Sequence, residues 1–323
     1  MKRVSNNQHS RHGFTIIELL TVMSIIIILI GLLVPSLNRV KRYSMDVKQR
    51  AQFHSIAIAL DLFNAEFDGY PNSDAKDDQV PTSQNYCGAM KLAEALVGQD
   101  LKGFNPASRF RRSGFGTAAP TPGMPYPALN YPDAATYNEN IRSRKMYLQL
   151  ENANAYQLRN IYDNTTITTA TYPGNTDTGF DPNTYVLCDS YNRVTNKTTG
   201  KKIGMPILYY KADSTKLNHP APSVLPATII ADIAKQIYNV YDNQALINMG
   251  LPWFAGPSHP LASGGGTIAG YAITDFPKKF YDITRDSKVS TGDRPVRADS
   301  YILMSAGFDG EYGTKDDIYN YSD

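Results

Sequence analysis

A long apolar segment near the start of the chain is the strongest pattern in the sequence. From Phe14 to Leu37, roughly 24 residues, the chain is apolar apart from four hydroxyl residues and a single charge, Glu18. About 20 apolar residues are enough for a helix to cross the hydrocarbon core of a membrane. The segment 14–37 therefore predicts a membrane-spanning helix. A carboxylate inside such a segment is costly and usually serves a function, so Glu18 is a candidate functional residue.

The pattern becomes amphipathic after the apolar segment. Over residues 38–71 apolar side chains recur mostly at three- and four-residue steps, which indicates a helix with one buried face. No strong breaker occurs before Gly69 and Pro71. The two segments together predict one helix of about 55 residues, roughly 80 Å long. Pro35 removes one backbone hydrogen bond, so a kink or local melting is expected at that position.

Residues 72–184 have the pattern of an inserted region made of loops and short helices. Ala89–Val97 predicts a short helix, and Tyr147–Tyr162 predicts another helix or two short helical pieces. Between them, residues 103–137 are rich in glycine, proline and tyrosine, which is typical of a long loop.

Sheet-forming sequence occupies the remaining residues, 185–323. Tyr185–Cys188 and Met205–Tyr210 are rich in β-branched and aromatic residues, and with the turn-like stretch between them they predict a hairpin. Thr228–Met249 has helical periodicity, and Ser300–Ser305 predicts a further strand. The expected fold class is therefore α+β: a long N-terminal helix packed on a small antiparallel sheet, with inserted helices and long loops.

Charge is distributed unevenly along the chain. There are 32 Lys and Arg and 30 Asp and Glu in total, but residues 1–13 carry Lys2, Arg3 and Arg11 and no acid. Positive charge before a spanning segment keeps that end in the cytoplasm and sends the rest outward. The remainder has 32 minus 3, or 29, basic residues against 30 acidic ones. It shows no basic stripe of the kind that nucleic-acid binding requires, so no nucleic-acid partner is expected.

The junction before the apolar segment resembles a processing site. A secretory signal peptide would end in a small-residue cleavage site after its apolar core, and the sequence here continues into Pro35 and a polar helical pattern instead. The run GFTIIELL, Gly13 to Leu20, resembles the prepilin motif of type IV pilins and type II secretion pseudopilins. The resemblance implies that a prepilin peptidase cuts between Gly13 and Phe14 and methylates the new amino terminus. It also implies that Glu18 pairs with the amino terminus of a neighbouring subunit during assembly.

An acidic, glycine-rich loop near the C-terminus is a candidate metal site. After Ser305 the chain holds three glycines and the aspartates Asp309, Asp316 and Asp317. Carboxylate and carbonyl oxygens are the ligands that calcium prefers, and glycines allow the tight turns that present them. The loop resembles the calcium loop of the major pseudopilin of type II secretion, which implies these three aspartates as ligands. Ser305 or backbone carbonyls near Leu303 would complete the set. The alternative is a metal-free acidic turn.

The chain has two cysteines, Cys87 and Cys188. Both lie in the part that the positive flank sends out of the cytoplasm, where a disulfide is permitted. A bridge would close about 100 residues and contribute roughly 4–5 kcal/mol in the chain-entropy model. Two cysteines alone do not establish pairing, which therefore stays open. No signature of a catalytic cysteine, a paired carboxylate or a triad is present in the sequence, so no catalytic residue is predicted.

The resemblance implies a structural, non-enzymatic subunit of a pilus-like filament, most closely a type II secretion pseudopilin of the major kind. It further implies a single span in the inner membrane and a periplasmic C-terminal domain. The implied partners are copies of this chain, other pseudopilins, the prepilin peptidase, the inner-membrane secretion assembly platform and membrane lipid, with calcium as cofactor. A minor pseudopilin at the filament tip is disfavoured, because in the family that subunit lacks the glutamate found here at Glu18. The alternatives are a type IV pilus subunit for adhesion, motility or DNA uptake, and a membrane-anchored exported binding protein or enzyme in which Glu18 is accidental.

Overall fold

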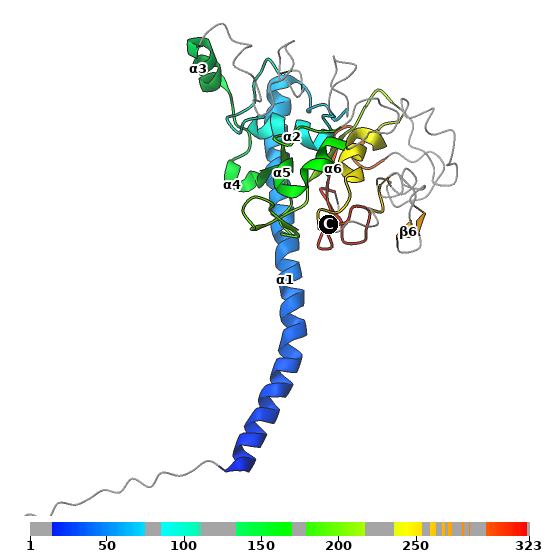
Figure 1. The fold of residues 1–323 in the computed structure, drawn as a ribbon. Coiled ribbons are helices and arrows are strands. Elements are labelled where there is room, and N and C mark those ends of the chain that lie inside the picture. Colours follow the sequence, from blue (N-terminus) through cyan, green and yellow to red (C-terminus); the bar gives the residue numbers. More distant parts are fainter. Residues whose placement is uncertain are drawn as a thin grey trace, which may run out of the picture. The chain divides into compact units, whose positions relative to one another are not determined.

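The described part of the chain begins with one long helix, α1 (Ile16–Phe67), which Figure 1 shows as a continuous ribbon. It covers both the apolar and the amphipathic segments and confirms the predicted long N-terminal helix. Pro35 lies inside α1 without interrupting it, so the local melting considered for this position does not occur. A proline costs the helix one backbone hydrogen bond, and the 52-residue helix continues on both sides of Pro35.

The computed structural model describes residues 15–74, 85–108, 110, 134–169, 179–216, 236–253, 259–262, 267–268, 271–272, 280, 284 and 295–321. The chain divides into two units, Met1–Met45 and Asp46–Asp323. Helix α1 passes from the first unit into the second, and the sheets, the remaining helices and the core all belong to the second.

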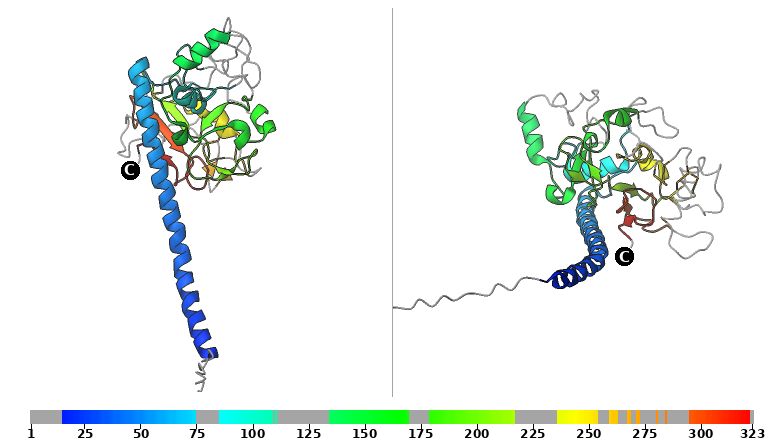
Figure 2. Two further views of the ribbon diagram at one scale, coloured as in Figure 1. Left: turned by 90° about the vertical axis from the view of Figure 1, so that its left-hand side faces the viewer. Right: turned by 60° about the horizontal axis from the view of Figure 1, so that its bottom comes forward.

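Within the second unit, α1 buries one face. The buried positions recur at three- and four-residue steps: Gln49, Gln52, Phe53, Ile56, Ala59, Leu60 and Phe63. Two of them fix the helix to the segment after residue 187. The Gln52 side-chain amide donates to the Cys188 carbonyl at 2.9 Å, and the Ser190 amide donates to the Gln49 side-chain oxygen at 2.8 Å. Figure 2 shows the part of α1 that belongs to the second unit lying alongside the strands.

Within the described ranges, the strands form four small antiparallel sheets. Three of these are two-stranded: β1 (Ala155–Gln157) with β2 (Tyr185–Leu187), β3 (Val194–Thr195) with β4 (Lys202–Ile203), and β6 (Thr267–Ile268) with β7 (Tyr271–Ala272). The fourth sheet is three-stranded, with β8 (Tyr301–Ser305) between β5 (Leu208–Lys211) and β9 (Ile318–Tyr319). All five residues of β8 are buried, and β8 has a partner strand on each side. Ser300–Ser305 is thus confirmed as a strand, and it is the central one of its sheet.

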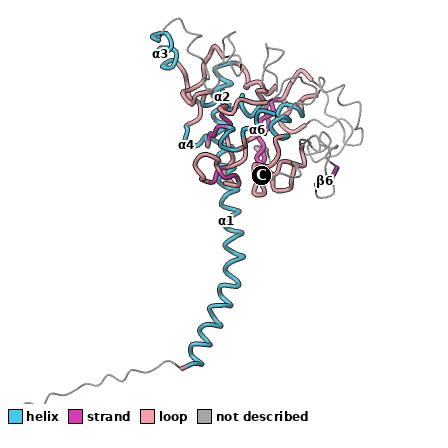
Figure 3. The backbone as a smooth tube through the Cα atoms, in the orientation of Figure 1, coloured by secondary structure: helices cyan, strands magenta, loops and turns pink. Residues whose placement is uncertain are grey.

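Short helices and loops make up most of the rest, as Figure 3 shows by secondary structure. The helices are α2 (Gly88–Val97), α3 (Ala134–Ser143), α4 (Leu150–Ala153), α5 (Leu158–Ile161), α6 (Asn164–Thr169), the 3-10 helix η4 (Val240–Asn243) and α8 (Gln244–Asn248). Helix α2 confirms the prediction for Ala89–Val97. The predicted element at Tyr147–Tyr162 is the pair α4 and α5, with strand β1 between them.

Helix α2 is buried along all 10 of its residues, and its first turn sits directly on β5. A Cβ atom added to Gly88 would lie 2.3 Å from the carbonyl oxygen of Tyr209. The side chain of Asn243 bridges the same two elements. Its oxygen accepts from the Ala89 amide at 2.8 Å, and its nitrogen donates to the Tyr209 carbonyl at 2.7 Å. The helix therefore receives its N-terminal cap from a residue more than 150 positions away.

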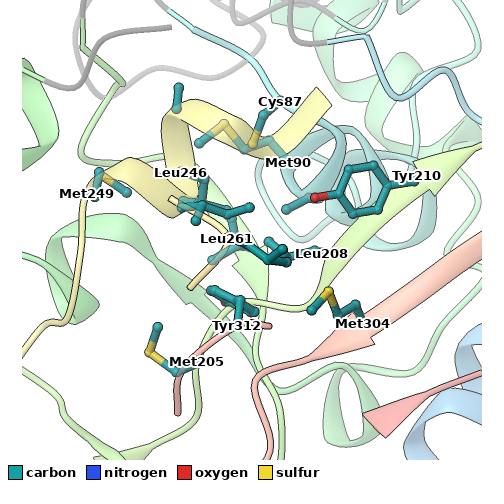
Figure 4. Packing of buried hydrophobic residues seen from close by; sticks show 14 of the residues in the cluster. Cys87, Met90, Met205, Leu208, Tyr210, Leu246, Met249, Leu261, Met304 and Tyr312 are labelled. Atoms are coloured by element: carbon teal, nitrogen blue, oxygen red, sulfur yellow. The ribbon is translucent and has the colours of Figure 1, made fainter. Parts of the chain in front are cut away.

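The core of the second unit is formed by α2, by the three-stranded sheet β5–β8–β9, which is called the central sheet below, and by the helices η4 and α8. Figure 4 shows Met90 from α2, Leu208 and Tyr210 from β5, Met304 from β8 and Leu246 from α8 packed around a common centre. Side chains from elements so distant in sequence enclose one apolar cluster. Together with α1, this arrangement confirms the expected α+β class, with a long N-terminal helix followed by small antiparallel sheets and helices.

The predicted hairpin is confirmed only in part. Tyr185–Cys188 and Met205–Tyr210 contain strands, but β2 pairs with β1 and β5 pairs with β8. The two runs nevertheless meet antiparallel at the bridge between Cys188 and Pro206. On either side of it, the Asp189 amide donates to the Met205 carbonyl at 2.8 Å and the Ile207 amide donates to the Leu187 carbonyl at 2.7 Å. The residues between them form their own hairpin, β3–β4. Strand β1 comes from sequence with helical periodicity, so local pattern did not reveal it as the partner of β2.

The helix predicted at Thr228–Met249 also needs correction. Residues 228–235 lie outside the described residues, and 236–239 are not helical. The helical stretch begins only at Val240, where the Asn239 side chain accepts a hydrogen bond from the Tyr241 amide at 3.0 Å. Asparagine favours such capping over the middle of a helix, because its side chain competes for backbone donors. The amphipathic segment is therefore divided at Asn239.

Candidate functional site

The apolar half of α1 has no buried side chains. Every residue from Thr15 to Ser44 is exposed, and Ile16 and Leu32 reach 81% and 72% exposure. Among the described residues, α1 is the one helix that is long and apolar enough to cross a membrane by length and composition. Continuous apolar surface of this extent marks a membrane or protein contact. The segment is therefore suited to insertion in lipid and to packing against other helices.

Glu18 begins the helix in a specific way. Its carboxylate accepts hydrogen bonds from both the backbone amide and the hydroxyl of Thr15, each at 2.8 Å. In return, the Thr15 hydroxyl oxygen accepts from the Glu18 amide at 3.3 Å. This reciprocal pattern is a capping box, which satisfies backbone donors that the first turn of a helix leaves without partners. Glu18 thus has a defined local role in the single chain.

Gly13 and Phe14, the predicted cleavage site, lie outside the described residues. Their processing and the methylation of Phe14 stay predictions. Immediately after the junction, Thr15 precedes α1, and the helix begins at Ile16. Thr15 was not among the predicted functional residues. The sequence nonetheless contains a signal that identifies Thr15, because a Thr-x-x-Glu spacing before an apolar run is the sequence signature of a capping box.

The C-terminal loop turns sharply between β8 and β9. Gly307 and Gly313 adopt φ values of 65° and 93°, a region that side chains disfavour. A Cβ atom on Gly307 would lie 2.1 Å from the carbonyl oxygen of Asp316. Glycine at this position therefore lets the two arms of the loop touch, which brings Asp316 next to Asp309.

Asp309 and Asp316 form a close pair. The Asp309 amide donates to the Asp316 carboxylate at 3.0 Å, and the two side chains also hydrogen-bond to each other. Burial and the neighbouring Asp316 raise the pKa of Asp309 to about 6. Burial opposes ionisation of Asp316 too, but the hydrogen bonds from Asp309 and Thr314 hold its pKa below the usual value. A hydrogen bond between two carboxyl groups requires a proton, and the raised pKa of Asp309 favours that residue as its carrier.

Asp317 makes hydrogen bonds of its own in the same loop. One carboxylate oxygen accepts from the Gly313 amide at 2.7 Å and from the Tyr319 hydroxyl at 2.9 Å. The other oxygen, Oδ1, is buried and has no hydrogen-bond partner among the described residues. Burial raises the pKa of Asp317 well above its usual value. A buried, unpartnered carboxylate oxygen is costly and calls for a positive partner.

The two remaining predicted ligands are occupied by structural contacts. The Ser305 hydroxyl donates to the buried carboxylate of Asp189 at 2.9 Å. The Leu303 carbonyl accepts from the Asn320 amide at 3.3 Å, and Leu303 itself pairs with Tyr209 between β8 and β5. Both residues thus hold the base of the loop to the sheet.

In the part of the chain that the structure describes, no three His, Cys, Asp or Glu side chains gather closely enough to hold a metal ion. The complete ligand set expected from the sequence is therefore not assembled. The chemistry that suits calcium is present as the close pair Asp309 and Asp316 and the unpartnered oxygen of Asp317 nearby. Calcium accepts such carboxylate oxygens together with carbonyls and water.

The loop is anchored to the core by His259 and Tyr312. The Tyr312 amide donates to Nδ1 of His259 at 3.2 Å, and Nε2 of the same ring lies 3.1 Å from the Gly250 carbonyl oxygen. These contacts require a neutral ring that is protonated on Nε2. Burial lowers the pKa of His259 to about 4, consistent with the neutral form. The Tyr312 hydroxyl also donates to the Pro206 carbonyl. The loop is thus tied to Pro206 directly and to Gly250 through His259.

Cys87 and Cys188 are free thiols, and both are buried in the core. The disulfide that the sequence left open is not formed. Burial raises the pKa of Cys87 to about 12 and that of Cys188 well above its usual value. Thiols in this state are poor nucleophiles, because the reactive species is the thiolate. The two cysteines therefore act as small apolar core residues.

Comparison with known protein families gives a match in the N-terminal region. Residues 8–34 match the family model of the prokaryotic N-terminal methylation motif. The match includes the Gly13–Phe14 junction, Glu18 and most of the apolar segment. No curated protein and no solved structure shows significant similarity to the chain. The motif and the exposed apolar helix support a pilin-like subunit that is anchored in a membrane by a single helix.

Proposed function

We propose that this chain is a type II secretion pseudopilin, a structural subunit that polymerises at the inner membrane into a periplasmic filament supporting protein export. The observation that carries the proposal is the N-terminal methylation motif on residues 8–34. It continues directly into an apolar helix whose side chains are all exposed up to Ser44. A filament subunit uses such a helix in two ways. Before assembly the helix anchors the subunit in lipid, and after assembly it contacts other subunits.

Glu18 supplies the specificity of assembly in this account. An acidic side chain within an apolar membrane segment is costly unless it has a partner. In the single chain Glu18 contacts Thr15, which contributes hydrogen bonds but no charge. Cleavage after Gly13 would create a free amine at Phe14, and that amine on an adjacent subunit is a suitable cationic partner. Pairing would relieve the cost only in the polymer, so it would favour assembly.

The test separates the charge of Glu18 from its capping role. Glu18→Gln keeps a capping acceptor, because glutamine also serves in a capping box, but removes the charge. Thr15→Val removes the capping hydroxyl and keeps the charge. We expect Glu18→Gln to be inserted and cleaved normally and yet to yield few filaments when sheared or cross-linked filaments are quantified. Thr15→Val is expected to assemble better than Glu18→Gln.

Thr21→Ala is the matched control for a polar change in the same helix. The Thr21 hydroxyl bonds to backbone carbonyls of its own helix, at 3.0 Å from Ile17 and from Glu18. This variant is expected to assemble at the wild-type level. Wild-type filament yield from Glu18→Gln would show that the charge of Glu18 does not drive assembly. The choice of secretion system is tested by deleting the gene: loss of exported protein supports the proposal, whereas loss of surface pili with intact export contradicts it.

Calcium at the C-terminal loop is part of the proposal. Asp309 and Asp316 would hold the ion, and the unpartnered oxygen of Asp317 lies in the same loop. A bound cation would offset the repulsion between these carboxylates and fix the arms of the loop to β8 and β9. In a filament subunit, that would stabilise the C-terminal part of the globular unit once it has been exported.

A further inference from the structure

A polar cavity of about 690 Å³ lies in the second unit, and its lining includes no residue of the C-terminal loop. Three segments form it: residues 72–74 just after the long helix, residues 211–216 at the end of β5, and residues 236–242 around the start of η4. No sulfur or imidazole ligand is found among the described lining residues. The lining is almost entirely polar, and its charged members are Asp74, Asp213, Asp242, Lys211 and Lys216.

Asp242 is the unusual member of this lining. The residue is only 1% exposed. One carboxylate oxygen, Oδ2, accepts a hydrogen bond from the Ser73 hydroxyl, and the Ser73 oxygen in turn accepts from the Lys211 amide at 2.9 Å. The second oxygen, Oδ1, is buried and has no hydrogen-bond partner among the described residues. A carboxylate oxygen in that state carries an uncompensated desolvation cost.

The charges around Asp242 increase this cost. Burial and the neighbouring carboxylate of Asp74 raise the pKa of Asp242 to about 8, and the Ser73 hydrogen bond and Lys91 only partly oppose them. Asp74 is itself exposed, and one of its oxygens accepts from the Asn72 side chain at 2.7 Å. Two acidic groups thus face the same region, and the nearby positive charge does not offset their repulsion and the burial of Asp242.

We propose that this cavity binds a hard divalent cation of the calcium type, held by the carboxylates of Asp242 and Asp74. Carboxylate, amide and hydroxyl oxygens together with water are the ligands of such ions, whereas softer metals select sulfur or imidazole. The side chains of Asn72 and Asn239 also line the cavity and offer amide oxygens. The open volume leaves room for the water molecules that such an ion retains.

A cation here would join the segment after α1 to the central sheet. Ser73 already contacts both Asp242 and the backbone of β5, and Pro71 accepts a hydrogen bond from the Tyr209 hydroxyl at 2.7 Å. The ion would complete this junction by neutralising the acidic groups at its centre. It would therefore make the attachment of residues 71–74 to β5 and η4 dependent on the cation. This site is separate from the C-terminal loop and does not depend on the filament function.

The test is calcium titration of the full chain in detergent micelles by isothermal calorimetry. All proteins carry Asp309→Asn and Asp316→Asn, so that the C-terminal loop contributes no site. This parent protein is expected to bind one calcium ion, and the further change Asp242→Asn is expected to abolish the binding. Asp74→Asn is expected to weaken it about tenfold, because affinity at such sites follows the ligand charge.

Asp213→Asn is the matched control in the same cavity. One oxygen of Asp213 already accepts from the Thr215 amide at 3.0 Å and the Thr215 hydroxyl at 2.6 Å, so its loss is expected to leave calcium affinity unchanged. Circular dichroism establishes whether Asp242→Asn is folded. If Asp242→Asn is not folded, the result is decided by comparing the calcium affinity of the parent protein with that of Asp74→Asn, because Asp74 is exposed. A parent protein without calcium binding, or equal affinity in the parent and Asp74→Asn, would overturn the proposal.

Discussion

Asp189 and Ser305 connect two parts of the chain that are 116 residues apart, through a buried hydrogen bond of 2.9 Å from the serine hydroxyl to the carboxylate. The other oxygen of Asp189 accepts from the amides of Tyr191 and Met205 at 3.2 and 3.1 Å. Burial raises the pKa of Asp189 to about 7 in spite of these bonds. Ser305, expected to bind calcium, is thus part of a buried structural link between the end of β8 and the segment after β2.

This link predicts a pH dependence of stability. The pKa of Asp189 is about 7 in the folded protein against a usual 3.8, so the folded state holds its proton more tightly. The contribution to stability is complete below pH 3.8 and is lost as the pH rises to 7. Asp189→Asn stays uncharged at every pH. Between pH 5 and 8 the wild type should lose about 3 kcal/mol relative to this variant, measured by urea unfolding of the full chain in detergent.

His259 acts in the opposite direction. Its pKa of about 4 lies below the usual 6.5, so its contribution to stability rises with pH between those values. Because both proteins contain His259, that effect cancels in the difference between wild type and Asp189→Asn. Parallel stability profiles for the two proteins from pH 5 to 8 would show that Asp189 does not titrate in this range.

The close contact between Gly88 and Tyr209 predicts a local sensitivity to size. Gly88→Ala would place a methyl group 2.3 Å from the Tyr209 carbonyl oxygen, forcing α2 away from β5 and weakening the Asn243 bridge. We expect a loss of about 1–3 kcal/mol, the usual cost of overpacking. Gly69→Ala is the control, because no atom lies within 4 Å of its added Cβ. Equal unfolding midpoints for the two variants would contradict the tight packing of α2.

Local sequence patterns were sufficient to predict the helices and strands whose structure is determined by their own residues. The apolar run and its amphipathic continuation identified α1, the run after Gly88 identified α2, and the β-rich run before Ser305 identified β8. Periodicity and continuous apolar runs are signals within one segment. Helix α1 buries one face between Gln49 and Phe63, whereas α2 and β8 are buried along their whole length. The capping box of Thr15 and Glu18 is equally local, although the resemblance of this run to a prepilin motif points only to processing and assembly.

Contacts between segments that are distant in the sequence could not be predicted from local patterns. The partner of β2 is β1, which lies in sequence with a helical pattern. The cap of α2 comes from Asn243, and no local signal marks that asparagine. The carboxylate of Asp242 meets Ser73 across 169 residues. Such contacts are set by the packing of distant segments, so neither the sheet order nor the polar cavity follows from periodicity or composition.

Calcium at the C-terminal loop predicts a stability change that can be isolated from the cavity. In the Asp242→Asn protein, calcium is expected to raise the melting temperature and a chelator to lower it. The gain should be about 2.7 kcal/mol at a hundredfold excess over Kd. Adding Asp309→Asn and Asp316→Asn should remove the response, because Asp317 alone would remain of the three proposed carboxylate ligands. A melting temperature that is indifferent to calcium and chelator would identify the loop as a metal-free acidic turn.

The central claim is that the N-terminal motif directs processing into a filament subunit, and the intact mass of the protein tests it most directly. The full gene would be expressed in cells with a prepilin peptidase, and the protein purified from their membranes. The account predicts a mature chain that begins at Phe14 and carries one added methyl group, while Gly13→Leu retains the mass of the full precursor. A wild-type protein that keeps residues 1–13, or begins at any other residue, would contradict the account.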